Sequence, residues 1–122
     1  MGIARDDQKA RDEHGRRGLE FFGAPLVLFL FLDEGLSTYS LFDLGLFAQT
    51  LMLAAHARGL GTCPMARAAV YPDIVRGALG LPAAKKLALG MPIGYPDDQA
   101  PVNRHRSTRV ALADAIRFFR ET

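Results

Sequence analysis

Residues 26–58 read LVLFLFLDEGLSTYSLFDLGLFAQTLMLAAHAR, and this segment dictates most of the architecture. Its first part, Leu26–Leu32, is short and apolar on both faces. It follows Pro25 and ends at the turn residues Asp33-Glu34-Gly35. A continuous apolar run of this length between turn signals is typical of a buried strand, so we predict a strand that is buried on both sides.

The second part of the segment predicts a long helix from about Tyr39 to Arg58. Ser37 or Thr38 can cap its beginning, and Gly59 can end it. Twelve of the 17 residues from 41 to 57 are apolar. A helix that is apolar nearly all round must be covered on most sides. Because a chain of 122 residues has little else to cover it, we expect another chain or further polypeptide to pack here.

The remaining sequence predicts a mixture of polar segments and short elements. Residues 1–20 are expected to form a solvated helix or an arm, and residues 96–110 a polar tail. Three further elements are expected: a helix from Tyr71 to Leu79 with Pro72 in its first turn and Gly80 after it, a strand from Lys86 to Gly94 bent at Gly90 and Pro92, and an amphipathic helix from Ala111 to Arg120. Strands and helices are thus interspersed, which indicates a mixed α and β fold.

Size and composition favour a single soluble domain that spans residues 1–122. The chain has a mass of 13.3 kDa, with 49% hydrophobic and 23% charged residues, which is ordinary for a globular protein. The longest apolar run, residues 24–32, is about half as long as a membrane span. The N-terminus is charged from Arg5 onward, so we expect no signal peptide and a cytoplasmic location.

The charge distribution does not indicate nucleic-acid binding. The net charge is only +2, and the 12 arginines are scattered along the chain. No aromatic residue lies between Arg104 and Arg109, where a basic nucleic-acid surface would need one. We therefore expect neither nucleic acid nor a membrane among the partners.

No side-chain constellation for catalysis or metal binding stands out. His14, His56 and His105 lack the spacing of metal ligands. The single cysteine, Cys63, excludes an intramolecular disulfide; it is either a nucleophile or a small buried hydrophobic residue, and the pattern favours the second. The glycines of residues 59–61 precede an extended segment rather than a helix, so they do not form a dinucleotide-binding motif.

Two segments have the chemistry to bind a ligand. Arg104 and Arg106 can point the same way after the second predicted strand and clamp a phosphate, although a solvated basic turn fits the spacing better. In Gly61–Arg67, glycine allows a close approach, and Pro64 stiffens an extended backbone whose N–H groups can face a flat ligand.

Together these segments form an ordered set of motifs. They are Phe22-Gly23-Ala24-Pro25, Asp43-Leu44-Gly45 with Gln49, Leu53-Ala54-Ala55, Gly59-Leu60-Gly61-Thr62-Cys63, Leu79-Gly80-Leu81-Pro82, Gly94-Tyr95-Pro96 and Arg104-x-Arg106. Each motif is generic alone, but their order and spacing resemble those of the FMN-dependent nitroreductase family. The resemblance covers at least residues 3–119, and it is to the C-terminal part of the family sequence only.

The resemblance implies an upstream portion that residues 1–20 do not supply. Family members are almost twice this long, and their N-terminal portion carries an Arg-Ser-x-Arg type segment that binds FMN. No such segment occurs in residues 1–20. We therefore expect a nitroreductase-like fold that is incomplete at the N-terminus. Each charge-assisted hydrogen bond contributes about 1.5–3 kcal/mol. Without the contacts of that segment, we therefore expect FMN to bind more weakly, by several factors of ten, than it binds to family members that carry the segment.

The resemblance also implies which residues would hold FMN. Arg104 and Arg106 match a late basic pair that contacts the phosphate. The segment that passes the isoalloxazine ring corresponds to Pro64, Met65, Ala66 and Arg67, with a backbone N–H at about Ala66 donating to flavin N5. Two residues depart from the family pattern: Arg67 stands where glycine is common in some relatives, and Leu41 where many close relatives have tryptophan.

The implied fold is α+β, with a central antiparallel sheet flanked by helices in an intertwined homodimer that binds FMN at the subunit interface. Such a dimer would cover the long apolar helix. The implied activity is ping-pong hydride transfer from NAD(P)H through FMN to a small aromatic acceptor, such as a nitroaromatic or a quinone. No catalytic side chain is needed, because the flavin supplies the chemistry. The alternative is a truncated, non-catalytic remnant that acts only as a dimerisation module.

Overall fold

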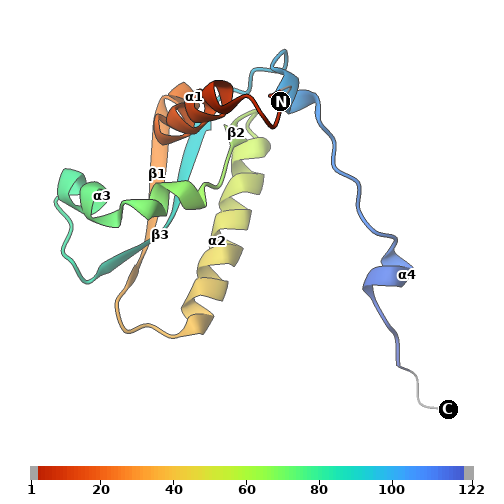
Figure 1. Cartoon of the computed structure of the whole chain (residues 1–122). Helices are drawn as coiled ribbons and strands as arrows, with labels where there is room; N and C mark the ends of the chain where they lie inside the picture. The colour runs from red at the N-terminus through yellow and green to blue at the C-terminus, as the bar shows by residue number, and fades with distance from the viewer. Residues whose placement is uncertain (1–2, 120–122) are drawn as a thin grey trace.

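The computed structural model describes residues 3–119 and is built around one antiparallel sheet (Figure 1). Its strands are β1 (Leu26–Asp33), β2 (Gly61–Thr62) and β3 (Lys85–Gly94), in the order β1-β3-β2. Helices flank the sheet on both faces. The predicted α+β architecture with a central antiparallel sheet is therefore confirmed.

One face of the sheet packs on α2 (Thr38–His56) and forms the core. Successive side chains of a strand point to opposite faces, so alternate residues of β1 and β3 reach the same layer. Met91 and Ile93 of β3 pack with Ala48 of α2, and Leu28 of β1 joins them. Met91 is completely buried, at 0% exposure.

The opposite face carries shorter elements. These are α1 (Gln8–Leu19), η1 (Phe21–Gly23), η2 (Ala66–Val70) and α3 (Pro72–Leu79). Gly90 of β3 faces this layer, because a Cβ atom built on it would meet side chains of η1 and η2. The sheet thus separates one long helix from several short ones.

The prediction that β1 is buried on both sides is wrong. Six of its eight residues are half-buried, and Leu26 is 53% exposed. In contrast, residues 90–93 of β3 are all buried. The reason is position in the sheet: β3 is the central strand, whereas β1 is an edge strand of the described sheet and one of its faces lies over an open groove.

The long helix α2 agrees with its prediction at both ends to within two residues. Ser37 occupies the capping position but its side chain makes no capping hydrogen bond, and Gly59 follows the helix with φ of +75°. Apolar residues along α2 remain exposed, including Tyr39 (81%), Phe42 (66%) and Leu53 (61%). Nothing within residues 3–119 covers them, so α2 presents the uncovered apolar surface that the sequence predicted.

In β3, Gly90 and Pro92 do not interrupt the strand as a bend would. The pairing with β1 is regular from Leu26 to Leu30, and it shifts only where Ala88 is inserted between two paired residues. Pro92 is tolerated because its backbone faces β2, where its carbonyl accepts a hydrogen bond from the Cys63 amide. The N–H group that proline lacks would also have pointed toward β2, so the pairing with β1 loses no hydrogen bond.

The predicted C-terminal helix from Ala111 to Arg120 is also wrong. Only Leu112–Ala115 (α4) is helical, and Ile116 has extended dihedral angles; Arg120 lies outside the described residues. The expected apolar face finds nothing to pack against, since Leu112 is 68% and Phe119 is 87% exposed. A short isolated helix is marginal in water without such packing.

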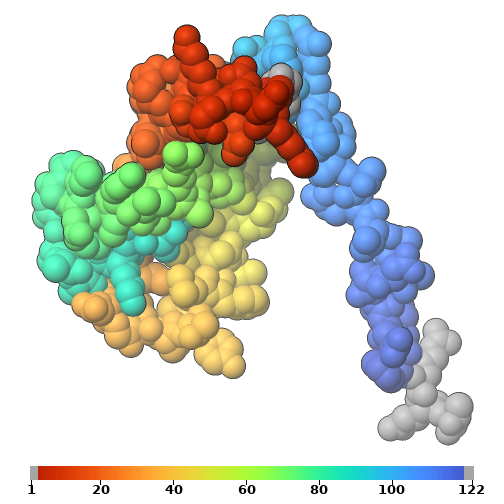
Figure 2. Space-filling model, viewed as in Figure 1, coloured from red at the N-terminus to blue at the C-terminus, as the bar shows by residue number. Residues whose placement is uncertain are grey.

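Residues 101–119 form an arm that leaves the rest of the molecule. After η3 (Pro101–Arg104) the chain runs outward and does not return over the sheet in the view of Figure 2, where the arm is blue.

The helix predicted at Tyr71–Leu79 is confirmed as α3, with Gly80 after it in the left-handed conformation. Among the described helices, none is long and apolar enough to cross a membrane.

Candidate functional site

The segment from Gly61 to Met65 runs antiparallel beside β3. Gly61 pairs with Gly94, and the same register continues beyond β2 to Met65 and Gly90. Met65 and Gly90 exchange two backbone hydrogen bonds, of 2.8 Å from the Met65 amide and 3.3 Å from the Gly90 amide. The predicted extended backbone therefore exists up to Met65, and it is anchored on the central strand.

The chain then turns rather than staying extended. The Ala68 amide donates to the Met65 carbonyl at 3.2 Å, which begins the 3-10 helix η2 at Ala66. The expectation of an extended Ala66 and Arg67 is wrong, because the chain turns back over β3 at these two residues. As a result, Ala66 and Arg67 occupy the crest of a turn whose ends are Met65 and Ala68.

This crest offers two backbone donors. Within residues 3–119, the amides of Ala66 and Arg67 donate no hydrogen bond. Both residues, and Pro64 before them, are exposed. Two adjacent free N–H groups on a backbone held by a sheet can donate to oxygen or nitrogen acceptors at the edge of a flat ligand.

The Arg67 side chain lies over α1, where two glycines make room for it. A Cβ atom built on Gly15 would lie 3.2 Å from Nη2 of Arg67, and one built on Gly18 would lie 3.9 Å from its Cδ. Its guanidinium forms no ion pair with any residue in the described range. Arg67 thus places an uncompensated positive charge beside the crest.

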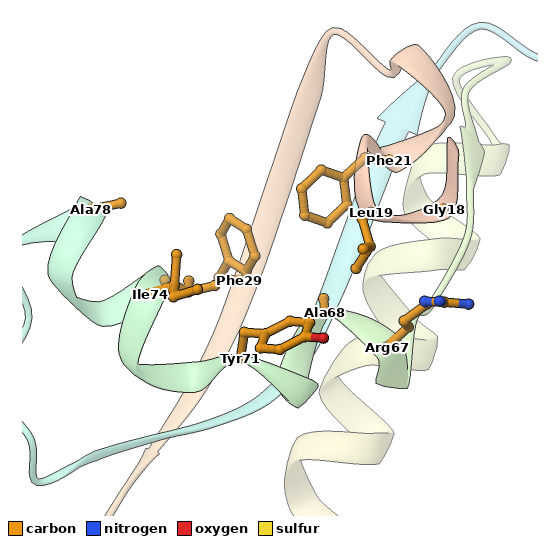
Figure 3. A pocket seen from close by; sticks show the side chains of 10 residues that line it. Gly18, Leu19, Phe21, Phe29, Arg67, Ala68, Tyr71, Ile74 and Ala78 are labelled. Carbon is orange, nitrogen blue, oxygen red and sulfur yellow. The ribbon is translucent and has the colours of Figure 1, made fainter. Parts of the chain in front are cut away.

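An apolar groove of about 460 Å³ adjoins the crest (Figure 3). Phe21 and Phe29 stand on one side of it with their rings edge to face, 5.7 Å apart and at 82°. Tyr71 lies below them in the view, and Arg67 lies at one end. The groove is lined by Gly18, Leu19, Phe21, Phe29, Arg67, Ala68, Tyr71, Ile74, Val75 and Ala78.

The sequence interpretation missed this groove, although it contained a signal. Phe29 lies one residue out of phase with the core residue Leu28, so the alternation along β1 points it to the opposite face. What no local pattern indicated is that α1, η1 and α3 would meet over that face without filling it.

Arg104 and Arg106 lie at the beginning of the arm. Arg104 ends η3 and donates through Nη2 to the carbonyl of Gln99 at 3.2 Å. Arg106 donates through Nη1 to the carbonyls of Asn103 at 2.7 Å and His105 at 3.2 Å. Both are exposed, and neither meets a carboxylate among residues 3–119, so both guanidinium groups keep donors for an anion.

The six predicted site residues fall into two groups. The first is Pro64–Arg67 and the second is Arg104 with Arg106; no hydrogen bond or ion pair links the groups within the described chain. The chain segments that lead to the two groups meet at one point, where the ring of Pro96 lies against Gly61. The arm therefore leaves the sheet beside the strand that leads into the crest.

Cys63 does not behave as the small buried hydrophobic residue that its pattern favoured. Its side chain is exposed. It follows the two-residue strand β2, at the outer edge of the described sheet, where no further element covers it. The groups of histidine, cysteine, aspartate and glutamate side chains in residues 3–119 include none that could hold a metal ion.

Comparison with known proteins places this geometry in context. The model of the nitroreductase family matches residues 3–95. Nitroreductase NfnB of Mycolicibacterium smegmatis is 41% identical over 120 residues, which are 98% of this chain and 51% of that protein. A 4-nitrobenzoate reductase of Pseudomonas putida is 39% identical over 107 residues, which are 88% of this chain and 47% of that protein.

A solved structure is also similar. The crystal structure of the FMN-dependent nitroreductase NfnB from Mycobacterium smegmatis in complex with NADPH superposes with a TM-score of 0.92 at 41% identity. The superposition covers 98% of this chain and 53% of that one. The chain spans about half the length of the curated relatives that it matches.

Proposed function

Since the chain belongs to the nitroreductase family, we propose that it acts in an FMN-dependent oxidoreductase of nitroreductase type. Residues 1–122 would form a single nitroreductase-like domain. The observation that carries this proposal is the pair of free amides at Ala66 and Arg67, on a turn anchored to the central strand. The cofactor is inferred from the relatives, since a similar solved structure is that of an FMN-dependent nitroreductase in complex with NADPH.

The donor groups of the crest fit the ring of a flavin. The isoalloxazine ring presents acceptors at N5 and at its pyrimidine edge, and the crest presents N–H donors without partners in the described chain. In the proposal, Ala66 donates its amide to N5, while Pro64 and Met65 lie along the ring. Arg67 adds a positive charge beside the site, which favours an electron-rich, anionic ligand.

The phosphate end of FMN is assigned to Arg104 and Arg106. Guanidinium groups match phosphate oxygens and form charge-assisted hydrogen bonds with them. In the structure both side chains bond only to carbonyls of their own segment, and such bonds can be exchanged for a phosphate with little loss. The contact between Pro96 and Gly61 fixes where the chain leading to these arginines leaves the sheet.

The chemistry of the reaction would come from the cofactor. Bound FMN would supply hydride transfer from NAD(P)H and reduction of a small aromatic acceptor, such as a nitroaromatic or a quinone, with the two substrates using the site in turn. The protein then has to bind, orient and desolvate, and it needs no side-chain acid or base. The crest would contribute backbone donors to this binding and orientation.

The test is a titration of FMN with the purified chain, followed by quenching of flavin fluorescence. Arg106→Ala is expected to weaken binding by about tenfold, because one charge-assisted hydrogen bond contributes about 1.5–3 kcal/mol. Arg109→Ala is the matched control: it removes the same charge from the same arm, and is expected to leave the affinity unchanged. Absence of quenching by the unaltered chain would contradict the proposal, and equal losses in the two variants would remove Arg106 from the site.

We further propose that the chain works as a cytoplasmic homodimer. The exposed apolar face of α2 supports a second copy as its cover, because buried apolar area is the main driving force of association. The same face supports the alternative function, a dimerisation module without catalysis. The two differ in one observation: the module would dimerise without binding FMN.

A further inference from the structure

Gly90 lies where no larger residue fits. A Cβ atom built on it would be 2.3 Å from the Cβ of Ala68, and 3.6 Å from the rings of Phe21 and Phe29. The first distance is far shorter than any contact between carbon atoms, which prefer about 3.5–4.0 Å. The backbone of β3 and the methyl group of Ala68 therefore touch directly, and η2 rests on Gly90.

Both ends of the crest are held by this one residue. At the first end, Met65 exchanges its two hydrogen bonds with the backbone of Gly90. At the second end, Ala68 bonds to the Met65 carbonyl and places its methyl group on Gly90. The free amides of Ala66 and Arg67 lie between these two ends. A side chain at position 90 would lift the Ala68 end while the Met65 end stayed bonded, so the crest would tilt.

We propose that Gly90 and Ala68 are a matched pair of small positioning residues that aim the Ala66 amide at the bound flavin. This inference rests on the proposed function for the role of the amide, but not for the geometry. A hydrogen bond weakens steeply when its angle departs from linearity, so a tilt of the crest would cost binding even in a folded protein. The pair is matched because only one of the two positions can carry a Cβ atom.

The competing explanation is that Gly90 serves packing alone. Such a role would change the free energy of unfolding, but it would not move the two amides in the folded protein or their response to FMN. The distinguishing measurement is therefore the position of the Ala66 and Arg67 amide resonances in ¹H–¹⁵N spectra of the full chain, recorded without and with FMN. Urea unfolding, recorded in parallel, reports stability separately.

Four variants complete the test. Gly90→Ala is expected to shift the resonances of Ala66 and Arg67 and to weaken FMN binding by about tenfold or more. The double variant Gly90→Ala with Ala68→Gly removes the clashing atom, and is expected to restore both readouts toward the original chain. Ala68→Gly alone is expected to change them little. Gly77→Ala is the control, since a Cβ atom there meets nothing within 4 Å.

The results separate this inference from the proposed function. Unchanged resonances and FMN affinity in Gly90→Ala would overturn it. If Gly90→Ala fails to fold, the double variant decides: a folded double variant with the amide resonances and FMN affinity of the original chain supports the matched pair, whereas a folded double variant that lacks either one overturns it. If the unaltered chain binds no FMN, the proposed function fails, and so does the role of the Ala66 amide toward a flavin. The resonance shifts in Gly90→Ala would still show whether Gly90 and Ala68 orient the crest.

Discussion

Two consecutive phenylalanines adopt a backbone conformation that favours glycine. Phe21 and Phe22 have φ of 53° and 54°, ahead of Gly23 at 75°. For residues with a side chain, the left-handed region costs roughly 1–2 kcal/mol each. Contacts offset this cost, because the Phe21 ring packs edge to face on Phe29 and the Phe22 ring lies 5.4 Å from that of His14. The turn thus sends one ring into the groove and the other against α1.

The ion pairs of α1 lead to a prediction at the residue scale. Arg16 bonds both carboxylate oxygens of Glu13, at 2.7 Å and 3.2 Å, and this lowers the pKa of Glu13 below its ordinary value. A lowered pKa stabilises the folded state above the unfolded pKa, and the contribution is lost as the pH falls through the folded pKa. Glu13→Gln should therefore lower the urea midpoint at pH 7, and the difference should shrink as the pH falls through the lowered pKa of Glu13.

A matched control exists for this titration. Glu34→Gln removes a carboxylate that forms no ion pair in the part of the chain that is described. Its urea midpoint should follow that of the original chain across the same range. A difference for Glu13→Gln that stays constant from pH 7 to pH 3 would contradict the assignment of the effect to its charge.

At the scale of elements, packing decided which predicted helices exist. The helix α3 has a proline in its first turn and a glycine after its end. It also has a surface to face, because its residues line one side of the groove that Phe29 of β1 lines on the other. The segment after Val110 has a similar apolar pattern, yet only four of its residues are helical. An amphipathic pattern predicts a helix only if a surface is there to receive its apolar face.

Gly77 inside α3 and Gly80 directly after it should respond oppositely to the same substitution. Gly77 lies inside the helix with open space around it, so Gly77→Ala should raise the free energy of unfolding by about 0.5–1 kcal/mol. Gly80 has φ of 65°, so Gly80→Ala should lower it by roughly 1–2 kcal/mol. Urea denaturation measures both changes. Effects of the same sign would mean that the end of α3 is not held in the left-handed conformation.

The whole molecule leaves large apolar surfaces uncovered, both on α2 and along the arm. Residues 3–119 bury only a small core around Met91, Ile93 and Ala48. A monomeric protein rarely exposes apolar patches of this kind. The molecular surface therefore argues for association, whether with a second copy or with further polypeptide.

Association through α2 can be tested with one charge. Phe42 is 66% exposed on α2, and Phe42→Arg would bury a guanidinium without a partner if this face forms the interface. The expected result is a dimer for the original chain and a monomer for the variant in sedimentation equilibrium. Ile74→Arg is the control, because Ile74 is 70% exposed but lies on α3, across the sheet from α2. A dimer that tolerates Phe42→Arg would place the interface elsewhere.

The parts of the fold that depend on local pattern could be predicted. Proline and glycine punctuation marks the ends of β1, α2 and α3, since these residues restrict or release φ whatever surrounds them. The candidate site was predicted as two segments, because exposed arginines and a proline-stiffened backbone are visible in the sequence. How these segments lie relative to each other was not predictable, because it depends on the path of the arm beyond Pro96.

The sequence by itself determined the two long strands of the sheet, the apolar character of α2 and the family to which the chain belongs. Only the tertiary structure decided that β1 is an edge strand, that the C-terminal helix stops after one turn, and that Gly90 holds both ends of the crest at Ala66 and Arg67. The physical reason is range: dihedral preferences and periodicity act over a few neighbouring residues, whereas burial and close contact depend on segments that meet only when the chain has folded.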